Sequence, residues 1–330
     1  MDLSVILISK NQGWNIKRLI ESVFIGADAV VSKEVILVDS ASTDDTISIA
    51  RNYPIRIIQL LSDQRLTSHA GRYIGYKNSL GDLILFLDGD MELCKGWLEQ
   101  AMIVLKNNPD AAIVNGQWID LPTTTPHDDK KHLELRNYSQ ADVEITEVGG
   151  AAMYKRSVLK EVGPFNPHLY SDGEPELSVR VRHAGYRIIR VGHPIAFHFS
   201  DPSDAISTLF KRWKRNLWLG MGQNMRQHLG TALFWPYVKE RGYGCLPLIG
   251  LLVGIICIIS SIVTGSWFLF IVWSSLLILL IILELLVKKS LYRTIYGLIQ
   301  RILVVDGTVR GFFIKPMNPE TFPDKYEIIQ

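Results

Sequence analysis

Short apolar runs alternate with helical patterns over the first 120 residues. Runs that are apolar on both faces predict buried strands at residues 5–8, 35–38, 55–60, 83–87 and 111–114. Between these runs, apolar positions recur with helical spacing, and the clearest helices are predicted at residues 16–23, 43–51 and 97–106. Such an alternation predicts a parallel sheet covered by helices on both sides, so we expect an α/β domain over residues 1–205. Ligands of such sheets gather at the carboxyl ends of the strands.

The apolar pattern changes near the end of the chain, where Glu284 is the only charged residue between positions 246 and 287. This segment is long enough for two membrane helices, which we expect at residues 246–264 and 267–287. Only two residues separate them, so the pair should form a tight hairpin. Glu284 lies four residues before Lys288, and an ion pair at the end of the span accounts for it.

Charge is segregated along the chain, although 35 basic and 33 acidic side chains give a net charge of only +2. Residues 1–205 are net acidic, whereas a juxtamembrane segment at 206–245 and the tail at 288–330 are net basic. Basic residues therefore flank the hairpin and are absent from its turn. The positive-inside rule then predicts that both termini, and with them the domain at residues 1–205, lie on the cytoplasmic side of the cell (inner) membrane. The tail is expected to be an amphipathic helix on the bilayer surface.

Composition and charge together exclude several classes of protein. Apolar residues make up 48% of the chain, and their concentration near the end excludes a freely soluble enzyme or a disordered chain. A nucleic-acid-binding protein would carry its basic stripe on the folded domain, which is acidic here. We therefore expect membrane lipid as a partner and no nucleic acid.

The strongest candidate chemistry follows the predicted strand at residues 83–87, which runs into Asp88-Gly89-Asp90. Carboxylates two positions apart project to the same side of an extended chain. Carboxylate oxygens suit Mg²⁺ or Mn²⁺, and such ions usually complete their coordination with substrate phosphates. A surface turn is the alternative, because Asp-Gly is a common turn pair.

A second strand also ends in a carboxylate. The predicted strand at residues 35–38 is followed by Asp39, a loop of small residues and a helix start. Alone, this arrangement could simply let Ser42 cap the next helix. With Asp88 and Asp90 on the same parallel sheet, it points to a shared site at the strand ends.

On these motifs the sequence resembles the family 2 glycosyltransferases, which have the GT-A fold, over roughly residues 2–200. The resemblance implies a nucleotide-sugar donor bound by the loop that follows the first strand and by the strand-end motifs. Asp39 matches the aspartate that holds the uracil or ribose. Asp88 and Asp90 match the pair that binds metal and diphosphate. The donor-binding residues that the resemblance implies are Ser9, Asn11, Asp39, Arg72, Asp88 and Gly89.

The resemblance also bears on other positions. Arg72 is the arginine of the family's Ala-Arg-Asn motif, whose asparagine is Tyr73 here. Arg72 would pair with the diphosphate or an active-site carboxylate, or, in the alternative, with a surface acid. His198 lies where related enzymes often place another metal or phosphate contact, and a merely packed histidine is the alternative. The proline and aromatic residue usual in the first loop are Ile8 and Lys10 here, which departs from the family pattern.

The general base of the family belongs to an acidic motif of the form Glu-Asp-x-(Asp/Glu)-Leu-x-x-Arg. Aligning its leucine and arginine with Leu177 and Arg180 puts Glu174 at the base position and Gly173 at the preceding glutamate. Asp172 is the alternative base because of this departure. In the remaining alternative, these acids have no catalytic role and only stabilise the N-terminus of a helix, where the helix dipole favours negative charge.

The resemblance thus implies a hexosyltransferase that uses Mg²⁺ or Mn²⁺ and inverts the anomeric centre. It would move a sugar from a UDP- or GDP-linked donor to a lipid-linked or glycan acceptor at the cytoplasmic membrane face, in surface polysaccharide or glycolipid synthesis. Two alternatives remain. One is a polyprenyl-phosphate sugar synthase, and the other is a catalytically inactive membrane scaffold of the same fold.

Overall fold

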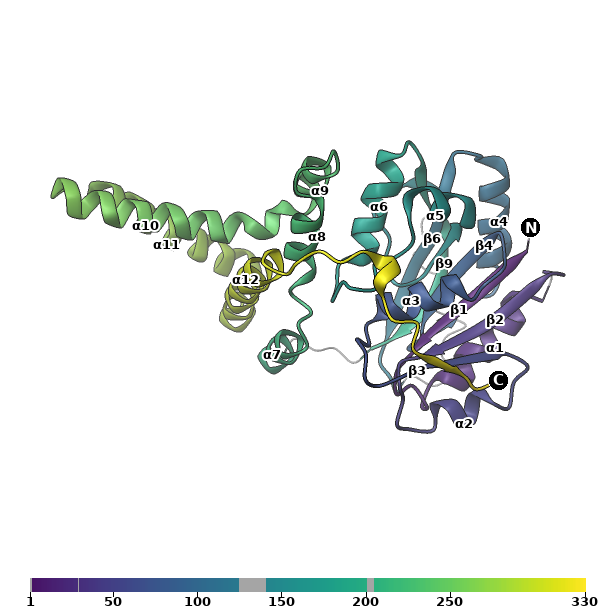
Figure 1. The fold of residues 1–330 in the computed structure, drawn as a ribbon. Helices are drawn as coiled ribbons and strands as arrows, with labels where there is room; N and C mark the ends of the chain where they lie inside the picture. The colour runs from purple at the N-terminus through teal and green to yellow at the C-terminus, as the bar shows by residue number, and fades with distance from the viewer. Residues whose placement is uncertain (1, 29, 125–140, 201–204) are drawn as a thin grey trace. The chain divides into compact units, whose positions relative to one another are not determined.

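The computed structural model describes residues 2–28, 30–124, 141–200 and 205–330 (Figure 1). The chain divides into two compact units. The first contains residues 1–202 and 317–330, and the second contains residues 203–316.

Parallel strands form the centre of the first unit. Strand β1 (Leu3–Ser9) pairs in parallel with β2 (Lys33–Asp39) on one side and β4 (Leu83–Asp88) on the other, and β2 pairs in parallel with β3 (Arg56–Leu60). This confirms the expected α/β architecture. Side chains of β1 alternate between two cores, so that both faces of the strand are buried. Val5 and Leu7 lie in one core, and Ile6 and Ile8 lie in the other.

The outer part of the sheet contains antiparallel pairs, which the strand pattern did not predict, although β6 and β9 pair in parallel. The sheet order is β10-β3-β2-β1-β4-β8-β6-β9-β5, with β7 paired to β9. Strand β8 lies antiparallel between β4 and β6, so the run at residues 111–114 does not join the parallel core directly. These outer strands are β5 (Met91–Leu93), β6 (Ala111–Leu121), β7 (Val143–Glu144), β8 (Ala152–Lys155), β9 (Arg187–Phe199) and β10 (Tyr326–Ile328).

Helices cover both faces of this sheet (Figure 1). Helices α1 and α4 contribute to one core, and α3, α5 and α6 contribute to the other. The helices of the first unit are α1 (Ile16–Gly26), α2 (Thr46–Ala50), α3 (Ser68–Lys77), α4 (Trp97–Asn107), α5 (Arg156–Val162) and α6 (Gly173–His183).

The end of the chain differs from the expected surface tail. Residues 317–330 belong to the first unit, where β10 pairs antiparallel with β3. Phe322 is buried, and its ring lies 6.2 Å from that of Tyr73 on α3. The physical reason is that β3 would otherwise be an unpaired edge strand, whose backbone groups need partners.

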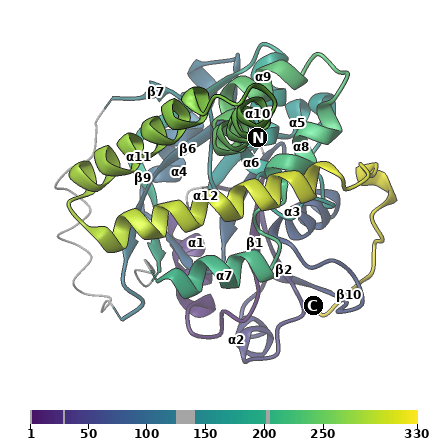
Figure 2. The same ribbon diagram turned by 90° about the vertical axis from the view of Figure 1, so that its left-hand side faces the viewer.

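The second unit is helical. Helix α12 runs alongside α7, as Figure 2 shows, and also packs on α8. The helices are α7 (Ile206–Lys214), α8 (Gly220–His228), α9 (Phe234–Arg241), the 3₁₀ helix η2 (Gly242–Cys245), α10 (Leu246–Thr264), α11 (Phe268–Lys288) and α12 (Leu291–Phe312); a second short 3₁₀ helix, η3 (Pro319–Thr321), lies in the first unit.

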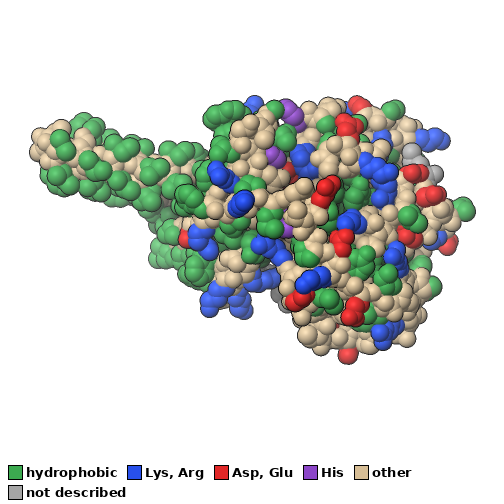
Figure 3. Space-filling view, in the orientation of Figure 1, with side chains coloured by type: hydrophobic (Ala, Val, Ile, Leu, Met, Phe, Trp, Pro, Cys, Tyr) green, Lys and Arg blue, Asp and Glu red, His purple; other side chains and the backbone are tan. Residues whose placement is uncertain are grey.

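Helices α10 and α11 are long and apolar enough to cross a membrane. Their apolar side chains are exposed (Figure 3), as Leu280 is at 63%. The expected ion pair of Glu284 with Lys288 is confirmed, and Arg301 also pairs with Glu284. Two helices with so much exposed apolar surface indicate association with a membrane.

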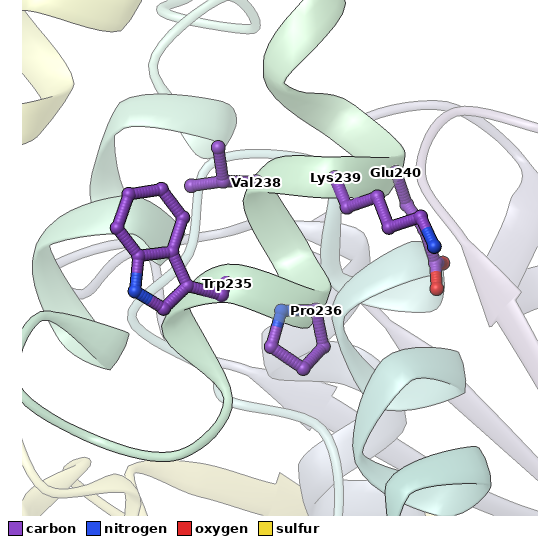
Figure 4. Close-up of a pocket in the computed structure, with 5 residues that line it drawn as sticks. All are labelled: Trp235, Pro236, Val238, Lys239 and Glu240. Carbon is purple, nitrogen blue, oxygen red and sulfur yellow. The ribbon is translucent and has the colours of Figure 1, made fainter.

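A surface pocket on α9 precedes the first of these helices (Figure 4). Trp235 and Lys239 line it, and the Trp235 side chain is largely exposed. An exposed tryptophan beside a lysine is typical of the boundary between lipid and water. The full lining is Trp235, Pro236, Val238, Lys239 and Glu240.

Helices α8 and α12 approach each other closely at Gly222. A Cβ atom at this position would lie 1.9 Å from the Thr308 carbonyl oxygen. We expect Gly222→Ala to lower the free energy of unfolding by about 1–3 kcal/mol, because backbone must move to admit the methyl group. Thermal unfolding of the detergent-solubilised protein measures this change.

The matched control for that substitution is Gly250→Ala. Gly250 lies in α10, and no atom lies within 4 Å of where its Cβ would be. Alanine is favoured over glycine inside helices, so Gly250→Ala should leave the unfolding temperature unchanged or raise it. Equal effects of the two substitutions would contradict a tight α8–α12 contact.

Candidate active site

The carboxyl ends of three adjacent parallel strands bring candidate residues to one edge of the sheet. Ser9 lies opposite Asp39 across one pair of strands, and Ile8 lies opposite Asp88 across the other. The Gly89 amide donates to the Ile8 carbonyl at 2.8 Å, which holds the turn after β4 against β1. The Ser9 hydroxyl is buried and has no hydrogen-bond partner among the described residues.

Asp39 organises the loops beside β1. It is fully buried, and its Oδ2 accepts from the Ser42 amide at 2.8 Å and from Gln59 Nε2 at 3.0 Å. Asn11 has a positive φ of 53°, and its side-chain oxygen accepts from the Thr43 amide at 2.8 Å. Ser42 therefore donates to Asp39. It does not cap the next helix, because Asp45 is the residue before α2.

Arg72 joins two carboxylates from different elements. Its side chain is 1% exposed; Nη2 lies 2.7 Å from Asp88 Oδ1 on β4, and Nη1 lies 3.3 Å from Glu174 Oε1 on α6. Nη2 also donates to the Gly150 carbonyl at 3.1 Å. Arg72 therefore pairs with the candidate-site carboxylates of Asp88 and Glu174 rather than with a surface acid.

Burial and charge shift the pKa values of Asp88 and Glu174 in opposite directions. Burial raises the pKa of Asp88 to about 6; Arg72 opposes this, and the charges of Glu174 and Asp90 add to it. Burial also favours a raised pKa for Glu174, but the charges of Arg72 and His69 outweigh it and hold that pKa well below its usual range. Glu174 is therefore ionised, whereas Asp88 can gain a proton under mildly acidic conditions.

Two glycines form a wall against this cluster. A Cβ at Gly150 would lie 2.1 Å from Asp88 Oδ2. A Cβ at Gly149 would lie 2.2 Å from the Trp118 ring. These contacts explain why the sequence has glycines here, since any side chain would displace Asp88 or Trp118.

His69 is a member of the cluster that sequence reasoning missed. It is 2% exposed, and its Nε2 lies 3.1 Å from Glu174 Oε2 and 3.1 Å from the Gly173 amide nitrogen. The one signal in the sequence was Gly173. It has no side chain where the family has glutamate, so it leaves room for another residue. Asp172, the alternative base, is the residue before α6 and has a φ of 62°.

A second group lies around Asp90. Its Oδ2 is 3.5 Å from His198 Nε2, and His198 Nδ1 is 2.6 Å from Asp120 Oδ1. Asp90 Oδ1 is buried and has no hydrogen-bond partner among the described residues. His198 is thus not merely packed.

The donor set around Asp90 fits a divalent cation that is completed by a substrate. Within the described residues, no three His, Cys, Asp or Glu side chains are arranged to hold an ion by themselves. Mg²⁺ and Mn²⁺ sites often need only one or two protein ligands, because phosphate oxygens and water supply the rest. The unpartnered Asp90 oxygen and the neighbouring imidazole of His198 meet that requirement.

Ion pairing of His198 predicts a pH-dependent contribution to stability. Hydrogen bonds to Asp90, followed by those to Asp120, raise its pKa to about 9 despite burial, from an ordinary value of 6.5. A raised pKa in the folded state gives stability that is complete below pH 6.5 and is lost as the pH rises through 9. In EDTA, the difference in unfolding temperature between wild type and His198→Gln should therefore shrink from pH 6.5 to pH 9.5. A difference that stays constant over this range would contradict the ion pair.

The first unit thus has a mixed sheet with acidic residues gathered at the ends of its parallel strands. Residues 4–163 match the model of the family described as Glycosyl transferase family 2. The chain is thus a glycosyltransferase, and residues 4–163 of its first unit are similar to family 2.

Known proteins support this assignment. AglE, a glycosyltransferase of Haloferax volcanii, is 26% identical over 229 residues, which cover 67% of this chain and 72% of AglE. The chain also matches animal N-acetylgalactosaminyltransferases but spans at most 39% of their length.

Two solved structures share the fold. The mannosyltransferase PcManGT of Pyrobaculum calidifontis, in complex with GDP-Man and Mn²⁺, superposes with a TM-score of 0.61 at 16% identity over 94% of this chain and 87% of that one. S. aureus TarS 1–349, in complex with UDP-GlcNAc, gives 0.51 at 16% identity over 78% of this chain and 81% of that one.

Proposed function

We propose that this protein is an inverting, metal-dependent hexosyltransferase that moves a sugar from a UDP- or GDP-linked donor to a lipid-linked or glycan acceptor. The observation that carries the proposal is the continuous set of contacts from Asp88 through Arg72 to Glu174. These contacts place an ionised carboxylate of α6 beside the strand ends where a donor would bind. Such a carboxylate is the group that direct displacement at an anomeric carbon needs.

The donor would lie over the ends of β1, β2 and β4. Asp39 would hold the nucleoside, helped by the loop residues Ser9 and Asn11. Gly89 and Asp88 would lie at the diphosphate, with the guanidinium of Arg72 nearby. The ligands of the two structures that share the fold, GDP-Man and UDP-GlcNAc, support a nucleotide-sugar of this type.

Mg²⁺ or Mn²⁺ would be held by Asp90 and His198, with Asp88. The ion would neutralise the negative charge on the leaving diphosphate. The Mn²⁺ in the PcManGT complex supports this choice of metal. In this chain Asp88 is already paired with Arg72, so Asp90 offers the more available oxygen.

In the transfer step, Glu174 takes the proton of the acceptor hydroxyl while the hydroxyl oxygen attacks the anomeric carbon. The bond from that carbon to the diphosphate oxygen breaks, and its electron pair leaves with the nucleoside diphosphate. A single displacement inverts the anomeric centre. A bound diphosphate would partly neutralise the positive charge of Arg72. Arg72 would then stabilise ionised Glu174 less, so the pKa of Glu174 would rise and the carboxylate would be a stronger base.

The second unit would anchor the enzyme at the cell (inner) membrane. Helices α10 and α11 would cross the bilayer as a hairpin, with the basic residues at its outer ends in the cytoplasm. This orientation leaves both termini and the glycosyltransferase domain cytoplasmic, where nucleotide-sugars are made. A lipid-linked acceptor would then be within the same membrane, as surface polysaccharide or glycolipid synthesis requires.

Release of nucleoside diphosphate by the full-length, detergent-purified protein tests the proposal. The assay uses a panel of UDP- and GDP-sugars, with Mn²⁺, Mg²⁺ or EDTA and a native-lipid extract as acceptor. We expect release with one donor, abolished by EDTA and by Asp90→Ala.

Mass spectrometry of the product separates the alternatives. A new glycosidic linkage supports the proposal, whereas a sugar joined to polyprenyl phosphate identifies a polyprenyl-phosphate sugar synthase. Absence of both release and donor binding in a folded protein would favour an inactive scaffold.

A further inference from the structure

A buried histidine lies directly behind the proposed base. His69 is near the start of α3, whose first turn is fixed by Thr67, since the Thr67 hydroxyl accepts from the Ala70 amide at 3.1 Å. The His69 side chain is 3% exposed, whereas that of Glu174 is 15% exposed. The carboxylate therefore faces the site, and the imidazole contacts it from the protein interior.

The two oxygens of Glu174 have different partners. Arg72 lies 3.3 Å from Oε1, and His69 Nε2 lies 3.1 Å from Oε2. One partner alone would let the carboxylate rotate about its last bond, but two partners on opposite oxygens fix its plane. In a buried setting such contacts are stronger than in water.

Gly173 provides the room for this histidine. A Cβ at position 173 would lie 2.2 Å from His69 Cδ2 and 2.4 Å from Nε2. On its other side the imidazole packs against Phe165, with ring centroids 6.2 Å apart. The glycine that departs from the family pattern is thus the residue that lets the histidine reach Glu174.

We propose that His69 is a positioning residue, which donates a hydrogen bond from Nε2 to Glu174 and holds the base in the orientation that transfer needs. This inference rests on the proposed function, because it assigns Glu174 the role of base. His69 acts through Glu174 and has no contact of its own with the reacting atoms.

The structure also offers a competing role for the same nitrogen. The Gly173 amide N–H is directed at Nε2, 3.1 Å away, and donates to it whenever Nε2 carries no proton. Only a protonated Nε2 can donate to Glu174, so the two arrangements exclude each other. In the second, the histidine would be a structural residue and would leave Glu174 Oε2 without this hydrogen bond.

Kinetics of the full-length protein test the positioning role. We expect His69→Ala to lower kcat by about 10- to 100-fold, since a misplaced catalytic group can cost that much, and to leave donor affinity unchanged. His69→Gln, whose amide can donate to Glu174, should recover most of the loss. His168→Gln is the matched control, because His168 is also buried but bonds to the Asn318 carbonyl. An unchanged kcat in His69→Ala, or no recovery in His69→Gln, would overturn the proposal.

A spectroscopic measurement tests the contact without relying on turnover. In ¹⁵N-histidine-labelled protein, the signal absent from His69→Gln identifies His69. We expect its Nε2 to be protonated and to shift in Glu174→Gln. An unprotonated Nε2 whose signal does not shift in Glu174→Gln would overturn the proposal. It would show that Nε2 accepts from the Gly173 amide instead.

The two proposals fail in different ways. An inactive Glu174→Gln enzyme together with a fully active His69→Ala enzyme would reject the positioning role and keep Glu174 as the base. A fully active Glu174→Gln enzyme would reject the base assignment, whatever the His69 spectrum shows.

Discussion

Replacing Glu174 with glutamine should lower kcat by about 100- to 10,000-fold, the contribution typical of a general base. The amide has the same shape and can still accept from Arg72, which lies 3.3 Å from Oε1, so donor binding should change little. It cannot take the proton of the acceptor hydroxyl. Steady-state kinetics, together with calorimetry of donor binding, separate the loss of the base from a loss of affinity.

Asp172→Asn is the matched control for this substitution. Asp172 has a positive φ of 62°, a conformation that asparagine adopts as readily as aspartate, so the backbone before α6 should be preserved. We expect this variant to keep most of the wild-type kcat. Full activity in Glu174→Gln combined with loss in Asp172→Asn would show that the base is Asp172.

The parallel centre of the fold could be predicted because its signals are local. Each of β1, β2 and β4 is a short apolar run that ends at a polar residue, and the buried side chains of β1 confirm that both faces are covered. The position of β8 between β4 and β6 could not be predicted, since periodicity indicates the existence of a strand and not its neighbours. The three residues of β10 carry too short a pattern to indicate a strand at all.

The places of the candidate site's acids in the fold were predictable for the same reason. Asp39, Asp88 and Asp90 lie at or just after the ends of apolar runs, and the structure places them at one sheet edge. The contact of His69 with Glu174 joins positions 105 residues apart, and no local pattern contains it. The pairing of Arg72 with two carboxylates likewise depends on how α3 and α6 pack on the sheet. Sequence motifs therefore identify the chemical groups, whereas tertiary packing determines their partners.

Replacing Arg72 with alanine should be the most destabilising change in the site. It leaves two acids, Asp88 and Glu174, without the cation that lies between them, and breaking a buried ion pair from one side costs about 3–5 kcal/mol. Arg187→Ala is the control, because Arg187 is 40% exposed and water screens its ion pairs, so its removal should change stability little. Thermal unfolding of the two variants measures the difference.

The loss caused by Arg72→Ala should also depend on pH. The pKa of Asp88 is about 6 with Arg72 present, and removing the cation raises it further. Because the folded state then holds a proton that the unfolded state releases, stability falls as the pH rises from about 4 upward. The destabilisation should thus be smaller at pH 5, where Asp88 is protonated, than at pH 8. A loss of equal size at both values would mean that Arg72 stabilises the fold by packing, for example against Phe165, rather than by its charge.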